Sequence, residues 1–570
     1  MLAGLLAIDV YLGLYRDRLS LSFPQETHHF TYVVMGRFVR LFQGWVPAGP
    51  CSVGWDCTAG FRPPTQPQSW TASMSWLWDV GNTYINETPL YPVPAAFFAW
   101  LFPGSVEVAA IGLRLWFAAL LLGMYRMAGM VGGRGAGLLA VILAMGMPGM
   151  FGLSLVHQDS IPLAAIGVWA GITLLTCRGF SRLGHAVTLA ILSLLAFRVP
   201  ENTSGTMFVV LACLAPGALA VVEAVKGFRA GEATRKRAVC LAILLLPIST
   251  VLALWEGREH AWQYIAYGIE SGDYGNPETD PNWFAAKAYI PIRSLAYVEE
   301  TWRHLVWWWV APFAWLGILV CVATRNRVRL AVAGTFLIPL VLLSSSVRIQ
   351  SNYIIPELPG FATGAAIGLL ALPWRRVRAA LVAGAVLASA YQRLDLALWT
   401  ARHVKNGEML STNMMGLPVI RAPRVKEGSA ARAIADVVAE VPGMGSLKRV
   451  MILAATKQRS LATCWVIELE VPQSTCFGPV WSRPTDTPPA LLDPAQYDVI
   501  AWIRVDGLHD FPFGEGAEIP GPFLENFDRM PPPVAGLART VLLSVKKTDF
   551  VETTTPAGPV YVRAPSATSP

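Results

Sequence analysis

The feature that most constrains this chain is a series of long apolar runs separated by short polar stretches. Most of the runs approach or reach the roughly 17–25 residues that cross a lipid bilayer as a helix. Only 15% of all residues are charged, against roughly a quarter in soluble domains. We therefore predict a polytopic α-helical membrane protein with about eleven transmembrane helices, the first of them at 2–15. The later runs are 106–127, 135–152, 161–177, 185–198, 205–225, 238–255, 303–323, 329–346, 357–372 and 378–396.

The basic residues between the runs indicate how the helices are oriented. Lys and Arg favour the cytoplasmic side of a membrane protein, and five short basic stretches alternate correctly with the runs. This orientation signal accounts for the net charge of +7, so we expect no nucleic-acid partner. The predicted cytoplasmic stretches are 126–134, 178–185, 226–237, 325–329 and 375–378.

The same alternation places the other connections on the extracytoplasmic side. Two of these are long: a first outer loop at 16–103 and a second at 256–302. Within the first, 28–43 is amphipathic and 90–103 is too short for a typical span. We predict that both form helices lying along the outer membrane surface.

The character of the sequence changes after residue 396. We predict a transmembrane domain over 1–396 and a small extracytoplasmic α/β domain over 397–570. Residues 430–440 have the pattern of a short amphipathic helix. The predicted strands are 448–454, 463–470, 497–504 and 540–546.

Two pairs of cysteines lie in the predicted outer regions. Cys51 and Cys57 belong to the first outer loop, and Cys464 and Cys476 belong to the C-terminal domain. If these regions face an oxidising compartment, each pair can close a disulfide. No CxxC metal-binding spacing is present in the sequence.

Five short polar motifs share the predicted outer face. Together they offer carboxylate, imidazole and guanidinium groups. This combination suits a substrate with a lipid tail in the bilayer and a phosphate at its surface. The motifs are Glu26-Thr27-His28-His29-Phe30, Glu87-Thr88-Pro89-Leu90-Tyr91-Pro92, His157-Gln158-Asp159, Phe197-Arg198-Val199-Pro200-Glu201 and the segment from Arg348 to Pro359.

The order of these motifs resembles the GT-C superfamily of membrane glycosyltransferases. The likeness is closest to its bacterial branch related to protein mannosyltransferases and aminoarabinose transferases. Glu26 to Phe30 resembles the family's acidic motif after the first helix, with either Glu26 or Gln25 at the Asp position. Glu87 to Pro94 resembles the segment that opens a juxtamembrane helix, and Leu113-Arg114-Leu115 resembles a helix with an Arg near its start. The remaining three motifs follow in the family's order, and the resemblance covers about 1–396.

The resemblance implies transfer of a sugar from a polyprenyl-phosphate carrier to an acceptor on the extracytoplasmic side, with inversion at the anomeric carbon. A carboxylate must deprotonate the acceptor hydroxyl, and Glu26 is the first candidate, with Glu87 sharing that role or positioning the acceptor. Arg198 and Arg348 are candidates to neutralise the leaving phosphate, and Tyr353 can add a hydroxyl donor. Further candidates for substrate binding are His28, His29, Asp159 and His260.

Each candidate has a structural alternative that the sequence leaves open. Glu26 and Asp159 are also suited to cap a helix, and Glu87 to open one. The two arginines are also suited to snorkel at the membrane interface. His28 and His29 are adjacent, so on a helix at most one faces the site.

Other functions compete with the transferase. A flippase or transporter is expected to show repeats and polar groups near the bilayer midplane, whereas this chain gathers its polar motifs at one surface. A glycan polymerase or ligase is expected to carry its arginines in a large loop in the second half. A divalent metal is possible but not expected, because the first loop lacks a D-x-D pattern, and we expect no other cofactor. We expect residence in a bacterial inner membrane, a lipid, glycan or protein acceptor, and surrounding membrane lipid as a partner.

Overall fold

The structure is a computed structural model of the 570-residue chain. The residues that it describes are 46–47, 61–62, 97–98, 101, 110–147, 149–150, 160–197, 203–254, 306–324, 326–344, 357–405, 409–412, 418–421, 427–441, 448–454, 463–464, 467–468, 470–471, 473–477, 493–503, 550–555 and 558–564.

The chain divides into two compact units. The first, here called the helical unit, contains Met1–Ile8, Leu113–Trp399 and Thr412–Pro418. The second contains Asp9–Gly112, Thr400–Ser411 and Val419–Pro570. The boundary predicted at 396 falls inside the helix Arg375–Lys405, and the division between the two units falls inside the same helix, after Trp399.

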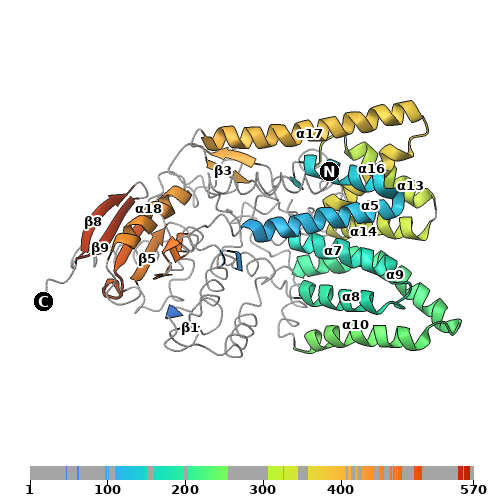
Figure 1. The fold of residues 1–570 in the computed structure, drawn as a ribbon, viewed down its shortest axis with the longest axis horizontal. Helices are drawn as coiled ribbons and strands as arrows, with labels where there is room; N and C mark the ends of the chain where they lie inside the picture. The colour runs from blue at the N-terminus through green and yellow to red at the C-terminus, as the bar shows by residue number, and fades with distance from the viewer. Residues whose placement is uncertain are drawn as a thin grey trace. The chain divides into compact units, whose positions relative to one another are not determined.

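Every apolar run predicted between 106 and 396 is helical over most of its described residues (Figure 1). The run 303–323 becomes helical only at Ala311, after a turn. The predicted first helix at 2–15 lies outside the described residues. The helices are α5 (Ala110–Gly146), α7 (Ser160–Thr176), α8 (Leu183–Phe197), α9 (Thr203–Arg229), α10 (Thr234–Leu254), α13 (Ala311–Ala323), α14 (Arg327–Ser344), α16 (Leu358–Ala371) and α17 (Arg375–Lys405).

Helix α5 consists of two helices joined at Gly133. That glycine has φ 81° and ψ 177°, a conformation that side-chain-bearing residues rarely adopt. The chain folds back there. The evidence is the close approach of Gly137 to Tyr125, whose carbonyl oxygen would overlap any side chain placed on Gly137. The two predicted runs 106–127 and 135–152 are thus two helices, with a much shorter connection than the predicted 126–134.

Among the described residues, one helical segment passes a test of length and composition for a membrane crossing: Arg114–Gly146, which includes the fold-back at Gly133. Shorter apolar helices occur at Ile161–Thr176, Leu183–Ala196, Ala311–Ala323 and Leu358–Ala371. The number of spans therefore stays a prediction.

The second unit contains a five-stranded sheet with strand order β6-β5-β7-β9-β8. Strand β5 pairs in parallel with β6 and β7, while β9 pairs antiparallel with β7 and β8. The strands are β5 (Lys448–Ala454), β6 (Ser474–Phe477), β7 (Val499–Ile503), β8 (Phe550–Thr555) and β9 (Gly558–Arg563). Other described elements are α18 (Glu427–Glu440), the 3-10 helix η6 (Pro494–Gln496) and two small two-stranded sheets, β1 (Val46–Pro47) with β2 (Phe61–Arg62) and β3 (Met409–Thr412) with β4 (Pro418–Arg421).

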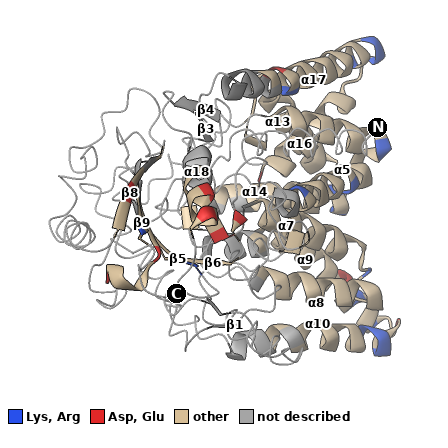
Figure 2. Cartoon of the chain, turned by 60° about the vertical axis from the view of Figure 1, so that its left-hand side comes forward, with Lys and Arg blue, Asp and Glu red and all other residues tan. Residues whose placement is uncertain are grey.

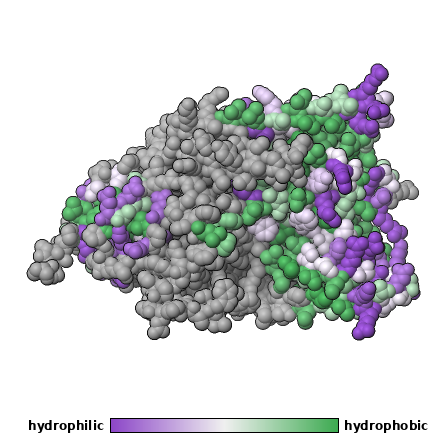
Figure 3. All heavy atoms as spheres, in the orientation of Figure 1, coloured by the Kyte–Doolittle hydropathy of each residue, from purple (hydrophilic) through white to green (hydrophobic). Residues whose placement is uncertain are grey.

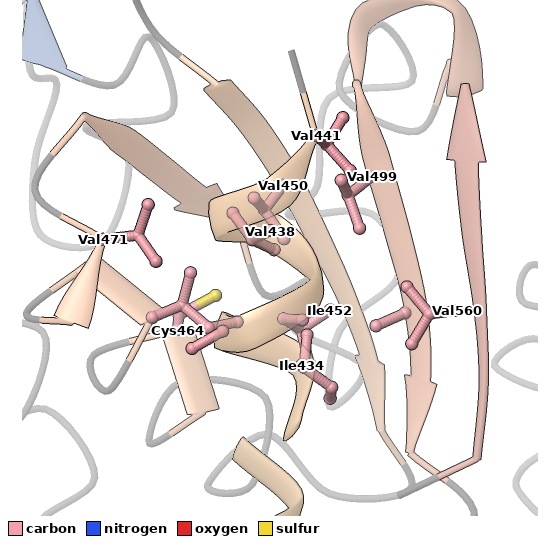
Figure 4. Close-up of a cluster of buried hydrophobic side chains, with 12 residues drawn as sticks. Ile434, Val438, Val441, Val450, Ile452, Cys464, Val471, Val499 and Val560 are labelled. Carbon is pink, nitrogen blue, oxygen red and sulfur yellow. The ribbon is translucent and has the colours of Figure 1, made fainter. Parts of the chain in front are cut away.

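Helix α18 packs its apolar face on this sheet (Figure 4). Ile434 and Val438 of α18 are fully buried against Ile452 of β5 and Val499 of β7. Cys464 lies in the same core and forms a disulfide with Cys476 of β6, with their Cα atoms 5.1 Å apart. The predicted helix 430–440 and the predicted strands 448–454 and 497–504 are confirmed, and so is this cysteine pairing.

One predicted strand is wrong. The described residues within 463–470 are helical, not extended. The buried residues explain the error, because Cys464, Ile467 and Val471 recur at the three- and four-residue spacing of a helix. Strands β6, β8 and β9 were not predicted, and the predicted strand 540–546 lies outside the described residues.

Candidate functional site

The basic stretches predicted to be cytoplasmic gather at one end of the helical unit. Figure 2 shows Lys and Arg concentrated at the ends of α17, α5 and α10. Hydrogen bonds join the turns there. Arg237 donates to the backbone carbonyl oxygens of Arg178 (3.2 Å) and Gly179 (2.5 Å), linking the α9–α10 turn to the α7–α8 turn. Arg329 donates to the carbonyl oxygen of Val131, next to the fold-back of α5.

The local sequence explains why the chain turns at these points. Asn326 precedes α14 and its side-chain oxygen accepts from the backbone N–H groups of Val328 and Arg329 at 3.0 and 3.3 Å, a typical helix N-cap. After α16, Arg378 donates to the carbonyl oxygens of Leu370 and Leu372, which satisfies groups that a helix end leaves open. The tight turns therefore bring successive helices together at the basic end.

The opposite termini of the same helices form the other end of the helical unit. The longer connections in the sequence start and finish at these termini. A hydrogen bond joins two helix termini at this end. Trp307, shortly before α13, donates its indole N–H to the carbonyl oxygen of Gly146, the last residue of α5, at 2.7 Å. Gly146 also lies against Ser389, which is far along α17 from its start at the basic turn. We call this the loop end of the helical unit.

Five of the sequence-predicted site residues lie close in sequence to helix termini at the loop end. Asp159 directly precedes α7, Arg198 directly follows α8 and His260 follows α10. Arg348 and Tyr353 lie between α14 and α16. The first-loop candidates are Glu26, His28, His29 and Glu87. All nine lie outside the described residues, so their positions and roles stay predictions.

Two buried charged side chains are described near helix termini that belong to the loop end. Arg114, in the first turns of α5, is 2% exposed. Glu357, immediately before α16, is 1% exposed. Arg114 belongs to the family pattern at Leu113–Leu115 and Glu357 to the segment from Arg348 to Pro359, but neither was predicted to be a site residue, because Glu357 opens the apolar run 357–372 and looks like the start of a helix.

No group of three or more potential metal ligands occurs among the described residues. The carboxylates predicted to act in the site, Glu26, Glu87 and Asp159, lie outside the described residues. The expected metal independence therefore stays a prediction.

Known proteins provide an independent comparison. No known family and no curated protein matches the sequence. Two crystal structures of ArnT from Cupriavidus metallidurans, one in the apo state and one bound to undecaprenyl phosphate, align with 100% of this chain and 99% of their own. Each alignment has a TM-score of 0.55 and 11% sequence identity.

The chain has the fold of ArnT over its full length. ArnT is a member of the GT-C superfamily, so the resemblance drawn from the motifs is confirmed at the level of the fold. An oligosaccharyltransferase from Archaeoglobus fulgidus aligns with 83% of this chain and 63% of its own, at 11% identity and a TM-score of 0.43. A likeness as weak as that adds nothing further about the fold.

Proposed function

We propose that this protein is a membrane glycosyltransferase that moves a sugar from a polyprenyl-phosphate carrier to an acceptor on the extracytoplasmic side. The observation that carries the proposal is the full-length likeness in fold to ArnT, one of whose structures contains undecaprenyl phosphate. Three of the five motifs that suggested the same chemistry lie next to helix termini of the loop end in the sequence, and the two first-loop motifs lie outside the described residues.

Exposed apolar side chains support placement of the helical unit in a membrane. Leu245 and Leu246 of α10 and Leu387 of α17 are 57%, 70% and 70% exposed. Figure 3 shows extended hydrophobic surface on the helices and hydrophilic residues at their basic end. Soluble proteins rarely expose contiguous apolar surface of this kind, whereas lipid tails cover it readily.

The disulfide supports an extracytoplasmic second unit. Disulfides such as Cys464–Cys476 form and persist in oxidising compartments and are rare in the cytosol. An extracytoplasmic second unit agrees with the predicted orientation, in which the five basic stretches face the cytoplasm. A bacterial inner membrane is the proposed location.

In the proposed reaction, the acceptor hydroxyl oxygen attacks the anomeric carbon while the bond from that carbon to the phosphate oxygen breaks. Glu26 takes the hydroxyl proton, and Glu87 shares this role or positions the acceptor. Arg198 and Arg348 neutralise the phosphate that leaves with the polyprenyl chain. A single displacement inverts the anomeric centre, and no covalent intermediate on the protein is needed.

The remaining candidates would help to hold the substrates. Tyr353 would donate its hydroxyl to the phosphate. One of the two first-loop histidines, together with Asp159 and His260, would contact the sugar or the acceptor. Neither the sugar nor the acceptor class is part of the proposal.

The test is sugar transfer by the purified protein in detergent. A panel of short-chain polyprenyl-phosphate sugars is supplied with candidate acceptors, and release of free polyprenyl phosphate is measured. We expect Glu26→Ala or Glu87→Ala to lose release while keeping the wild-type melting temperature. Glu232→Ala is the matched control, because Glu232 is an exposed carboxylate in the α9–α10 turn at the basic end.

Two outcomes would contradict the proposal. Specific binding of the donors without release by the wild type would favour a flippase or transporter. Normal release by both Ala variants would move the active site away from the first outer loop even though the fold stands.

A further inference from the structure

The N-terminus of α16 carries an acidic residue that does not cap the helix. Glu357 has φ −89° and ψ −19°, and its side chain makes no capping hydrogen bond. Helices prefer Ser, Thr, Asp or Asn at this position, because their short side chains reach the free N–H groups. The glutamate therefore does not start the helix by capping it.

The carboxyl group is also buried. Glu357 is 1% exposed, and neither carboxyl oxygen has a hydrogen-bond partner among the residues that the structure describes. Buried polar groups in proteins are nearly always hydrogen-bonded, and burial of an unsatisfied carboxyl is strongly unfavourable. An apolar side chain of similar size would suit this position better in the unliganded protein.

The surroundings of α16 are apolar and closely packed. Phe361, one turn into α16, lies edge-on to Phe336 of α14 at 4.4 Å between ring centroids and to Trp315 of α13 at 6.1 Å. The two phenylalanine rings carry no hydrogen-bond donor, and the indole of Trp315 donates to neither carboxyl oxygen of Glu357. We therefore infer that a bound ligand supplies the hydrogen bonds that the Glu357 carboxyl group lacks.

We propose that Glu357 binds the sugar of the lipid-linked donor by accepting hydrogen bonds from its ring hydroxyls. The proposal rests on the proposed function and adds a sugar-recognition residue to the site. Glu357 stands at the loop end, with the candidate phosphate ligands Arg348 and Tyr353 shortly before it in the sequence. The carboxyl oxygens of Glu357 are hydrogen-bond acceptors, and the ring hydroxyls of the sugar next to the phosphate are suitable donors to them.

The variants Glu357→Leu and Glu357→Gln separate the possibilities. Leu removes both acceptors, and Gln keeps one carbonyl oxygen of similar position. Thr363→Val is the matched control: Thr363 is 2% exposed, and its hydroxyl also lacks a hydrogen-bond partner among the described residues. Thr363 lies about 9 Å further along α16, away from the loop end.

The assay measures dissociation constants of the full-length protein in detergent for two kinds of probe. One is bare polyprenyl phosphate, and the other is polyprenyl phosphate carrying mannose, glucose or arabinose. We expect Glu357→Leu to bind the sugar-bearing probes at least about tenfold more weakly, and the bare lipid as well as wild type does. Glu357→Gln is expected within about threefold of wild type, and Thr363→Val unchanged.

A stability measurement guards against misfolding. Because Leu removes an unsatisfied buried group, the melting temperature of Glu357→Leu should equal or exceed that of wild type. Unchanged binding of sugar-bearing lipid by Glu357→Leu would overturn the proposal. So would equal weakening for both kinds of probe, or a Gln variant as defective as Leu. If wild type binds neither kind of probe, the proposed function itself fails.

Discussion

Helices α13 and α16 approach each other through glycines, and this contact predicts a sharp effect of a single methyl group. A Cβ atom on Gly317 of α13 would overlap the carbonyl oxygen of Gly364 and lie 2.8 Å from the backbone nitrogen of Gly368. Both obstacles are backbone atoms of α16, so no side-chain rotation can relieve them. Small residues permit this close approach in membrane proteins as well.

The magnitude of the Gly317→Ala effect follows from two opposing terms. Carbon atoms in contact prefer separations of about 3.5–4.0 Å, so the helices would have to move apart. Moving them apart would loosen the ring contact between Trp315 and Phe361. Overpacking of this kind costs about 1–3 kcal/mol, and here we expect the upper end because the neighbours are backbone. Alanine favours the helix by about 1 kcal/mol over glycine. The free energy of unfolding should therefore fall by about 2 kcal/mol.

The matched control is Gly384→Ala in α17. Gly384 is exposed, and a Cβ atom placed there meets no atom within 4 Å. Only the helix-propensity term applies, so this variant should gain up to about 1 kcal/mol. Thermal unfolding of the two purified variants in one detergent should shift the midpoint in opposite directions. Equal or greater stability of Gly317→Ala relative to Gly384→Ala would refute the close-packing argument.

Three further predictions concern other parts of the molecule. Replacing Cys464 and Cys476 together by Ala should cost the second unit about 3 kcal/mol, since the bridge closes a loop with a sequence separation of 12; thermal unfolding measures the loss, and free thiols in the oxidised wild type would contradict it. Arg237→Ala should cost about 2–4 kcal/mol, because the buried guanidinium donates to three carbonyl oxygens, whereas Ala at the exposed Lys236 should change the midpoint little. Burial raises the pKa of Tyr497 above its ordinary value of 10.0; its contribution to the unfolding free energy is therefore complete below pH 10 and falls as the pH rises above 10, because the unfolded chain then releases a proton that the folded one keeps. Denaturant unfolding between pH 8 and 11 should show this fall, and a Tyr497→Phe variant with an equally steep fall would assign it to other groups.

The helical part of the fold could be predicted closely from the sequence. An apolar run long enough for a helix has few other stable forms, and the charged turns between runs mark where each helix ends. The fold-back at Gly133 is an example, because predicted helices on both sides are present even though the connection is shorter than expected. The second unit was predicted less completely, since short strands such as β6 and β8 carry a weak alternating signal and depend on partners that are distant in sequence.

Part of the candidate site, too, could be predicted from the sequence, and part could not. Sequence order alone put five of the nine candidate residues close to helix termini of one end, because alternation of helices fixes which connections share a side. It did not single out Glu357, since a glutamate before an apolar helix looks like an ordinary helix start.

By itself, then, the sequence determined the ten helical runs and the basic turns that share one end of the helical unit. Hydrophobic length and charge are local properties, and they act on each helix separately. Only the tertiary structure decided that glycines of α13 and α16 touch, that Cys464 meets Cys476 and that the Glu357 carboxyl is buried without a described partner. These facts depend on which surfaces of distant segments meet, and packing sets that for the whole chain at once.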